Sequence, residues 1–330
     1  MRLLFITQKL HGQDAFIILW LRAFQKRGYD VTVLCLEKSG VSDVMNVISL
    51  GKEEGRGMVA QVFRFWKLIC TLPYDCVFIH MSPVWGLLGA WWWIPRRTPV
   101  YLWYTHYKMQ AGLRLLGWYG RRLFCATAQS LPQYEGNPKK VVVGHGIDLA
   151  FWPVRENVCT NPHRLIAVHR LSRSKRLELC ITSLLHLSPD FTLDIYGIEA
   201  EKEYVEELYD LVARLKLQQR VHFHGSVPMS TLLEVYTRHR LILNMASETI
   251  DKTMLEAMRC GCYPVTTKAN AAAIGIPLAP EDRPESIAAF VREYAQRAPI
   301  PPEEMAKIVE RRHSLDGLIA RMDAFVSSGT

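Results

Sequence analysis

The stretch LILNMASETIDKTMLEAMRCGCYPVTT, residues 241–267, decides the architecture because a helix-like segment stands between two short apolar runs. The runs LILNMAS and YPVTT are rich in strand-forming residues, and we expect both to be strands. Residues 252–260 are expected to form a helix that ends at Gly261, since glycine is common just past a helix C-terminus. A strand–helix–strand unit of this kind predicts a parallel sheet covered by helices.

The same alternation of apolar runs and longer amphipathic segments continues through the whole chain. At 330 residues, and with roughly 150 residues per domain, the chain predicts two domains. We expect an α/β fold of two Rossmann-like, doubly wound domains that face each other across a central cleft, where such sheets bind ligands. The expected domains are residues 1–150 and 151–310, with a polar, proline-containing linker at 148–163, and residues 311–330 form a helix that packs back on the first domain.

The individual elements are predicted from the same patterns. Short runs rich in valine, leucine, isoleucine and aromatic residues indicate strands at 2–7, 30–36, 75–81, 99–105, 122–127, 140–144, 164–170, 191–197, 221–225, 241–247 and 263–267. Amphipathic segments indicate helices at 14–28, 57–72, 109–122, 175–187, 199–215, 229–238 and 252–260, with further helices from about residue 284.

Cysteine usage and hydropathy indicate the compartment. The eight cysteines form no CxxC pair and the chain has no N-x-S/T sequon, which is typical of reduced thiols in a cytoplasmic protein. The apolar run at the start, MRLLFIT, is too short for a signal peptide. The longest apolar run, residues 84–94, is far shorter than the roughly 20 residues that span a bilayer, so we expect no membrane span.

Positive charge and tryptophan are concentrated in the first half of the chain. Residues 1–150 hold 18 Lys plus Arg against 9 Asp plus Glu, whereas the remainder holds 22 against 23, and all nine tryptophans lie at or before Trp152. Basic and aromatic residues stand together at 63–67, 91–97 and 117–124. This mixture suits an anionic membrane surface, and it also suits a nucleic-acid backbone. A third interpretation is that the tryptophans are core residues and the cations are solvated.

Four cations follow the strand that ends near His169. The loop contains Arg170, Arg173, Lys175 and Arg176, and a helix begins after it. Cations and helix N–H groups at such a turn can hold an anion together. The alternative is a basic loop in solvent.

Two glutamates flank the start of the helix at 252–260. Glu248 lies on the loop after a strand, and Glu256 lies eight positions later, on the second turn of the helix. A carboxylate near a helix N-terminus is ordinarily a dipole partner, which accounts for Glu248 but not for Glu256. Because a carboxylate can accept two hydrogen bonds at once, both residues are suited to bind adjacent sugar hydroxyls.

The pattern S-E-x7-E-A-M-x-x-G-x-x-P-V resembles the E-x7-E signature of retaining GT-B glycosyltransferases, particularly glycosyltransferase family 4. Arg170 and Lys175 match the spacing of that family's G-R-L-x-x-x-K segment, and GHGID (144–148) resembles its N-G-V-D segment. LDIYG (193–197) and RVHFHGSVP (220–228) resemble two further family blocks, so that five matches occur in order. The chain differs from the family at Ile250 and Asp251, where F-G is common, and it has only one glycine in the loop after the first strand.

The resemblance implies roles for individual residues. Arg170 and Lys175 would neutralise the diphosphate, Glu256 would bind the ribose, and Glu248 would hold the sugar, while an aspartate at position 251 would repel the phosphates. The expected catalytic residues are therefore His106, Arg170, Lys175 and Glu248. The expected donor-binding residues are Gly12, Arg170, Lys175, Gly197, Ser226, Val227, Glu248, Lys252, Thr253, Met254, Leu255 and Glu256.

The expected function is retaining transfer of a hexose-type sugar from a nucleotide sugar, with a UDP- or GDP-sugar favoured, to a glycan or lipid-linked acceptor. No D-x-D pair and no histidine cluster with a metal-site spacing are present, so we expect a metal-independent enzyme without a cofactor. The expected location is cytoplasmic, peripheral at the inner face of a membrane. The alternatives are a glycosyltransferase that acts on nucleic acid, a non-catalytic GT-B protein that binds nucleotide sugars, and another GT-B enzyme such as an epimerase.

Overall fold

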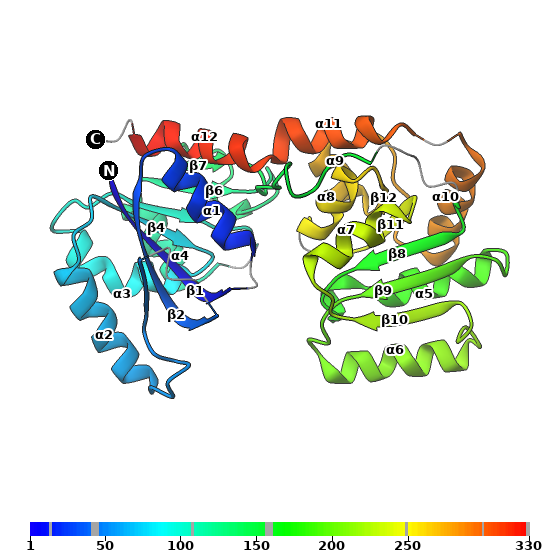
Figure 1. Ribbon diagram of the computed structural model, residues 1–330, viewed down its shortest axis with the longest axis horizontal. Helices are drawn as coiled ribbons and strands as arrows, with labels where there is room; N and C mark the ends of the chain where they lie inside the picture. Colours follow the sequence, from blue (N-terminus) through cyan, green and yellow to red (C-terminus); the bar gives the residue numbers. More distant parts are fainter. Residues whose placement is uncertain are drawn as a thin grey trace. The chain divides into compact units, whose positions relative to one another are not determined.

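The computed structural model describes residues 1–12, 15–40, 46–106, 109–155, 161–247, 250–298 and 300–327. The chain packs into two compact units (Figure 1). Unit 1 comprises Met1–Gly146 together with Leu315–Thr330, and unit 2 comprises Ile147–Ser314. Each unit contains one parallel sheet with helices between most successive strands, so the predicted α/β fold class is confirmed.

Unit 1 is built on a seven-stranded parallel sheet with the order β3-β2-β1-β4-β5-β6-β7. Alternate residues of each buried strand pack on opposite faces, as Phe5 and Ile6 of β1 do, and both faces are covered. The edge strand β3 was not predicted, because its four residues are only partly buried and give a weak apolar signal. The strands are β1 (Arg2–His11), β2 (Asp30–Ser39), β3 (Asn46–Ser49), β4 (Cys76–His80), β5 (Val100–Trp103), β6 (Arg122–Cys125) and β7 (Lys140–Val142).

Helices cover both faces of this sheet. Figure 1 shows α1 (Ala15–Lys26) and α12 (Leu315–Val326) together on one face, where Phe24 and Leu318 belong to the same core cluster. The other face packs against α2 (Met58–Thr71), α3 (Pro83–Trp93) and α4 (Ala111–Tyr119). No helix in the described part of the chain combines the length and the apolar character that a membrane span requires.

The helix α3 was not predicted, because its run of apolar residues shows no helical period. Trp85 and Trp93 enter the core from it, and α4 packs closely beside it. A Cβ atom on Gly112 of α4 would lie 2.2 Å from the carbonyl oxygen of Pro83. The close packing of α3 and α4 therefore depends on the absence of a side chain at this position.

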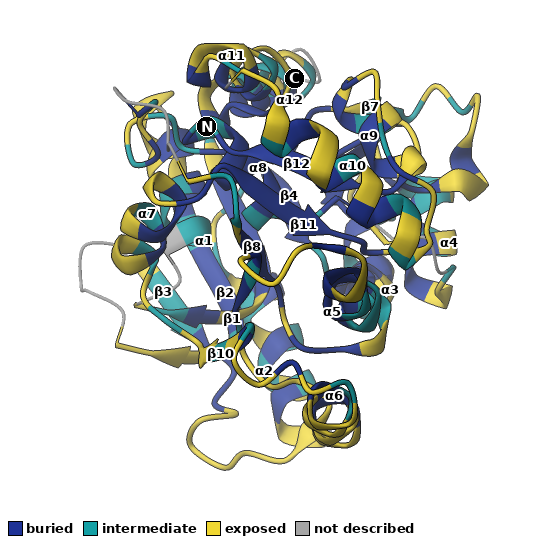
Figure 2. Ribbon diagram, turned by 90° about the vertical axis from the view of Figure 1, so that its right-hand side faces the viewer, coloured by how far each residue is buried: buried dark blue, intermediate teal, exposed yellow. Residues whose placement is uncertain are grey.

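Unit 2 is built on a five-stranded parallel sheet with the order β10-β9-β8-β11-β12. Figure 2 shows β8, β11 and β12 as buried, which agrees with their nearly continuous apolar sequences. The strands are β8 (Arg164–Val168), β9 (Thr192–Tyr196), β10 (Val221–Gly225), β11 (Leu241–Asn244) and β12 (Tyr263–Thr266).

The helices of unit 2 follow the amphipathic pattern of the sequence. In α6, Tyr204, Leu208 and Val212 are buried at a four-residue spacing, so one stripe of the helix faces the core. The helix expected at 175–187 begins only at Leu177, because Arg176 adopts the left-handed conformation with φ 50°. The helices are α5 (Leu177–Ser183), α6 (Lys202–Arg214), α7 (Met229–Thr237), α8 (Lys252–Arg259), α9 (Lys268–Ile274), α10 (Pro284–Gln296) and α11 (Pro302–His313), and short 3-10 turns occupy Pro132–Tyr134, Arg173–Lys175 and Leu184–His186.

The described part of the expected linker, residues 148–155 and 161–163, includes side chains that are anchored in unit 2. Trp152 is buried against Tyr236. The guanidinium group of Arg155 donates hydrogen bonds to the carbonyl oxygens of Tyr236 and His239, at 2.7 and 2.9 Å. These contacts join the start of unit 2 to the end of α7, so residues 152–155 are part of a packed structure.

Candidate functional site

The order of the strands in unit 2 defines a topological switch point beside β8. The chain proceeds outward from β8 to β9 and β10 and then returns to β11, on the other side of β8. The loops that follow β8 and β11 therefore leave the sheet in opposite directions, and ligands of doubly wound sheets bind at this point. His169 follows β8 and Asn244 ends β11, so both residues lie at the switch point.

Asp251 lies between these two loops, immediately before α8. Its carboxylate accepts hydrogen bonds from Lys175 Nζ at 2.5 Å and from Asn244 Nδ2 at 3.1 Å, and it contacts His169 Nδ1 at 2.9 Å. The other ring nitrogen of His169 lies 3.3 Å from the carbonyl oxygen of Leu243. Three polar side chains, one at the end of β11 and two after β8, thus surround one carboxylate.

The electrostatic environment keeps Asp251 ionised. Burial by itself raises the pKa of this carboxyl group, but the hydrogen bond and charge of His169 and the charge of Lys175 outweigh burial and hold the pKa well below its usual range. The side chain of Lys175 is only 10% exposed. Its positive charge is therefore balanced inside the protein by Asp251.

This arrangement changes the interpretation of Asp251. The sequence indicated an aspartate that faces the diphosphate, but the structure turns its carboxylate towards Lys175 and His169. The family segment G-R-L-x-x-x-K has glycine at the position of His169, and family members commonly have glycine at the position of Asp251. The two departures from the family pattern are thus joined in a single contact.

Additional hydrogen bonds tie the loop after β8 to the loop after β11. The backbone N–H of Ser247 donates to the carbonyl oxygen of Ser174 at 3.0 Å, and Arg176 Nε donates to that of Met245 at 2.7 Å. The hydroxyl of Thr253, in the first turn of α8, donates to the carbonyl oxygen of Val168 at 2.6 Å. The N-terminus of α8 is consequently fixed at the end of β8.

The structure places the remaining predicted residues of α8 in different environments. Lys252 and Glu256 form an ion pair at 2.8 Å within the helix, and Glu256 is buried. The side chains of Met254 and Leu255 lie in the hydrophobic core, so only their backbone atoms could contact a ligand.

Arg170 and Glu248 were predicted to lie on the two loops, and the structure describes only Arg170. Arg170 is exposed and makes no hydrogen bond or ion pair with any described residue. Glu248 lies outside the described residues.

Gly197, Ser226 and Val227 follow β9 and β10. The N–H of Gly197 donates to the carbonyl oxygen of Gly225 at 2.8 Å, which joins the ends of the two strands. Gly197 has φ 151°, and a Cβ atom there would lie 1.5 Å from the carbonyl oxygen of His169. Ser226 is exposed, whereas Val227 is half-buried and packs on the core of unit 2.

Two predicted residues belong to unit 1. Gly12 is exposed just after β1, and its N–H donates to the carbonyl oxygen of Ser39 at 2.7 Å. His106 is exposed after β5, with its ring against the edge of Tyr104. Nothing in the structure assigns a ligand to either residue.

Sequence reasoning missed His80, which ends β4 at the switch point of the sheet in unit 1. Its ring stacks on Trp103, with the ring centroids 5.0 Å apart. Burial lowers the pKa of His80 to about 3, so the imidazole is neutral. His80 could have been noticed in the sequence, because DCVFIHM, like YLWYTHYK, places a histidine at the end of a predicted strand.

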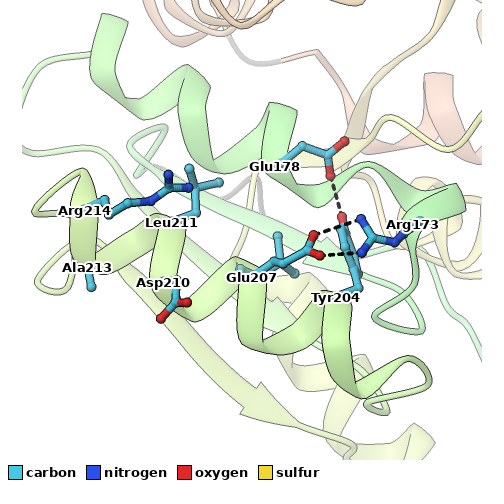
Figure 3. A pocket seen from close by; sticks show the side chains of 9 residues that line it. Arg173, Glu178, Tyr204, Glu207, Asp210, Leu211, Ala213 and Arg214 are labelled. Carbon is cyan, nitrogen blue, oxygen red and sulfur yellow. Dashed lines mark hydrogen bonds and ion pairs between the residues drawn. The ribbon is translucent and has the colours of Figure 1, made fainter.

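Two pockets lie near these loops. One is lined by Arg176, Ser247, Thr267, Lys268, Ala269, Glu281 and Asp282, and it adjoins the ends of β11 and β12. The larger pocket, shown in Figure 3, is lined mainly by α6. There Arg173 pairs with Glu207, and Tyr204 donates a hydrogen bond to Glu178. None of the predicted donor-binding residues lines the larger pocket.

Comparison with known families identifies the class of protein. The family described as "Glycosyltransferase Family 4" matches residues 11–151, and the family described as "Glycosyl transferases group 1" matches residues 151–276. Together they cover residues 11–276, and so the chain is a glycosyltransferase with the GT-B fold. It belongs to the group of glycosyltransferases similar to family 4, as the five sequence blocks predicted. No curated protein matches the chain in a sequence comparison.

Solved structures support the fold along the whole chain. HepE from Anabaena, in complex with UDP and glucose, is 18% identical with a TM-score of 0.80, and the match covers 99% of this chain and 100% of that chain. Sucrose-phosphate synthase from Thermosynechococcus elongatus is 13% identical with a TM-score of 0.79, covering 99% and 98%. The lipopolysaccharide outer core galactosyltransferase WaaB is 14% identical with a TM-score of 0.73, covering 99% and 100%.

The close approach at Gly197 gives a first prediction. Gly197→Ala should lower the free energy of unfolding by about 3–5 kcal/mol, because the new methyl group would collide with the backbone of His169. Gly225→Ala is the matched control, since Gly225 also has a positive φ but open space around its Cα, and it should cost only about 1–2 kcal/mol. Urea denaturation measures both, and equal losses would contradict the predicted collision.

The depressed pKa of Asp251 predicts how stability depends on pH. The ionised carboxylate stabilises the fold fully above its unfolded pKa of about 3.9, and this stabilisation is lost as pH falls below that value. Asp251→Asn should therefore cost roughly 3–5 kcal/mol at pH 7, because Lys175 loses its partner. The cost should shrink by roughly 1 kcal/mol between pH 4 and pH 3.

Urea titrations at these pH values measure the difference in unfolding free energy between the wild type and Asp251→Asn. Asp282→Asn is the control, since Asp282 pairs with Arg176 at a more exposed position and should change stability little. A cost for Asp251→Asn that does not change with pH would refute the ion-pair explanation.

Proposed function

We propose that the protein is a retaining glycosyltransferase that moves a hexose from a nucleotide sugar to a hydroxyl group of a glycan or lipid-linked acceptor. The observation that carries this proposal is the gathering of Arg170, Lys175 and the N-terminus of α8 at the switch point of unit 2. Cations and helix N–H groups together form a site for phosphate. HepE, which shares the fold, has been solved with UDP, with UDP-glucose, and with UDP and glucose, and these complexes support a UDP-sugar as the donor.

Arg170 is proposed to bind the diphosphate of the donor. Its side chain is exposed, and no contact with a described residue has to break before it can pair with a phosphate oxygen. In the proposed reaction, Arg170 stabilises the charge that develops on the diphosphate as the bond to the sugar breaks. Gly197 and Ser226, at the ends of β9 and β10, would lie beside the nucleoside.

Glu256 is proposed to bind the ribose hydroxyls. Its carboxylate is buried and already accepts from Lys252 at 2.8 Å. A carboxylate has room for further hydrogen bonds, so a ribose hydroxyl can share Glu256 with Lys252 or replace it. Lys252 would then turn from Glu256 towards the phosphates.

Lys175 requires a rearrangement before it can act. Its ammonium group is held by Asp251 at 2.5 Å, and so a diphosphate must compete with this carboxylate for the same cation. The diphosphate can bind Lys175 only if it displaces Asp251 or attracts the ammonium group more strongly than Asp251 does. We therefore expect weaker donor binding than a site with glycine at position 251 would have.

The chemistry is proposed to proceed by front-face substitution with retention at the anomeric carbon, as the family resemblance implies. The leaving phosphate oxygen would help to accept the proton of the acceptor hydroxyl, since no residue was identified as a dedicated base. Glu248 is proposed to hold the sugar hydroxyls, and His106 and Gly12 to approach from unit 1. Arg170, Lys175 and the N-terminus of α8 would neutralise the leaving group, so the proposed reaction is metal-independent and requires no cofactor.

The acceptor is proposed to be a lipid-linked glycan presented at the inner face of a membrane, with the enzyme in the cytoplasm. The support is the composition of the first half of the chain, in which basic residues stand beside tryptophans. Peripheral contact with anionic lipid would bring the enzyme to such an acceptor.

One observation favours a second candidate function, which is nucleotide-sugar binding without turnover. The ion pair between Lys175 and Asp251 withholds a cation that catalysis needs. One measurement separates the two candidates, because only the enzyme would release a nucleoside diphosphate from the nucleotide sugar. Conversion of the donor in the absence of any acceptor would instead indicate an epimerase.

The proposed donor site is tested by a panel of UDP-, GDP-, ADP- and TDP-sugars in thermal-shift and calorimetric titrations. Lys175→Ala and Glu256→Ala should weaken binding of the preferred donor, and Lys175→Ala should lower turnover by about 10²–10³-fold, as the loss of one charge-stabilising donor does. Lys307→Ala, which removes an exposed lysine on α11, is the control. Wild-type binding and hydrolysis in both site variants would rule out this site.

The competition at Lys175 gives a separate prediction. Asp251→Asn should tighten binding of the preferred nucleotide sugar by about tenfold or more, because it removes a negative charge from beside the diphosphate and frees Lys175. Calorimetry at a temperature where both proteins are folded measures the change, with Asp282→Asn as the control. Weaker binding by Asp251→Asn would mean that the carboxylate itself assists the donor.

A further inference from the structure

Two neighbouring helices of unit 1 each expose a stripe of apolar side chains. On α2, Val59 and Phe63 are four residues apart and 68% and 63% exposed. On α3, Leu87 and Trp91 repeat this spacing and are 43% and 52% exposed. Because residues four apart lie on the same side of a helix, each pair forms a continuous stripe. Both stripes are turned away from the sheet.

Aromatic contacts join the two stripes into one surface. The rings of Phe63 and Trp66 lie 5.6 Å apart, and those of Trp66 and Trp91 lie 6.1 Å apart, so the contact passes from α2 to α3. Trp66 Nε1 also donates a hydrogen bond to the carbonyl oxygen of Leu88 at 2.9 Å, which fixes α2 against α3. We name this surface the aromatic face, comprising Val59, Phe63, Trp66, Leu87, Trp91 and Trp92.

The segment that carries the aromatic face is strongly cationic. Residues 57–134 contain eight Lys plus Arg and a single acid, Asp75. That acid is already paired with Arg2 at 2.6 Å. At the end of α3, the guanidinium group of Arg96 lies 3.0 Å above the ring of Trp92, and Arg97 next to it is exposed. Positive charge therefore borders the exposed rings directly.

We propose that the aromatic face is a docking surface for an anionic lipid bilayer. Tryptophan favours the boundary between headgroups and acyl chains, and the aliphatic side chains beside it would enter the outer part of the apolar layer. The cations would bind the lipid phosphates at the anionic surface. The inference rests on the proposed function and deepens it, because it assigns the proposed contact with anionic lipid to one surface of unit 1, away from the donor site.

The chemistry of this face disfavours other partners. A second copy of the chain would bring one cationic surface against another, which opposes association. Nucleic acid would engage the cations and could stack on the rings, but it offers no partner for Val59 and Leu87. A bilayer satisfies the charged, the aromatic and the aliphatic residues together.

The experiment is vesicle flotation of the full chain at low salt, with phosphatidylglycerol-containing vesicles and pure phosphatidylcholine vesicles. The wild type should float with the anionic vesicles and not with the neutral ones. The variants Phe63→Ser/Trp91→Ser and Arg96→Glu/Arg97→Glu should each lower the bound fraction at least about fivefold. Leu278→Ser and Arg311→Glu, which change exposed residues of unit 2, are the matched controls and should bind as the wild type does.

Calorimetric binding of the preferred nucleotide sugar is measured in parallel and should be unchanged in all four variants, which separates this inference from the donor site. The inference is overturned if the wild type does not float, or if the face variants float as well as the controls. It is also overturned if light scattering shows a dimer that the face variants abolish. Tighter binding to single-stranded DNA than to anionic vesicles would assign the face to nucleic acid.

Discussion

The candidate site depends on the ion pair between Asp251 and Lys175. A buried ammonium group would be costly without a partner, and Asp251 supplies one at the end of β8, where His169 and Asn244 complete its hydrogen bonds. The same contact joins the loops after β8 and β11, which the strand order would otherwise separate. It therefore serves the stability of unit 2, and it also sets the charge that an incoming anion would meet.

Much of the fold could be predicted because parallel strands buried on both sides have a strong apolar signal. The eleven predicted strands all overlap observed strands, and only the short, partly buried edge strand β3 was missed. The helix α3 was also missed, but for a different reason. It is apolar almost all round, so its sequence shows no helical period of apolar and polar residues. A single left-handed residue, Arg176, shifted the start of α5, and nothing in its side chain signals that conformation.

The candidate site was less predictable than the fold. Sequence spacing brought Arg170, Lys175 and Glu256 to one end of the sheet, because loops after parallel strands meet there. Spacing carries no information on which polar groups pair, and so the contact between Asp251 and His169 could not be derived from it. The burial of Met254 and Leu255 was accessible in principle, since large apolar residues in a short helix usually face the core.

The position of α12 has a consequence for how the chain is made. This helix lies more than 160 residues after β7, yet Leu318 and Met322 pack with Trp20 and Phe24 in one core cluster of unit 1. Unit 2 is a single continuous segment and can complete its core as soon as it has been synthesised. Residues 1–146 leave the ribosome before unit 2 does, and one face of their sheet stays uncovered until α12 has been synthesised. Unit 1 thus begins to emerge before unit 2 and completes its core after it.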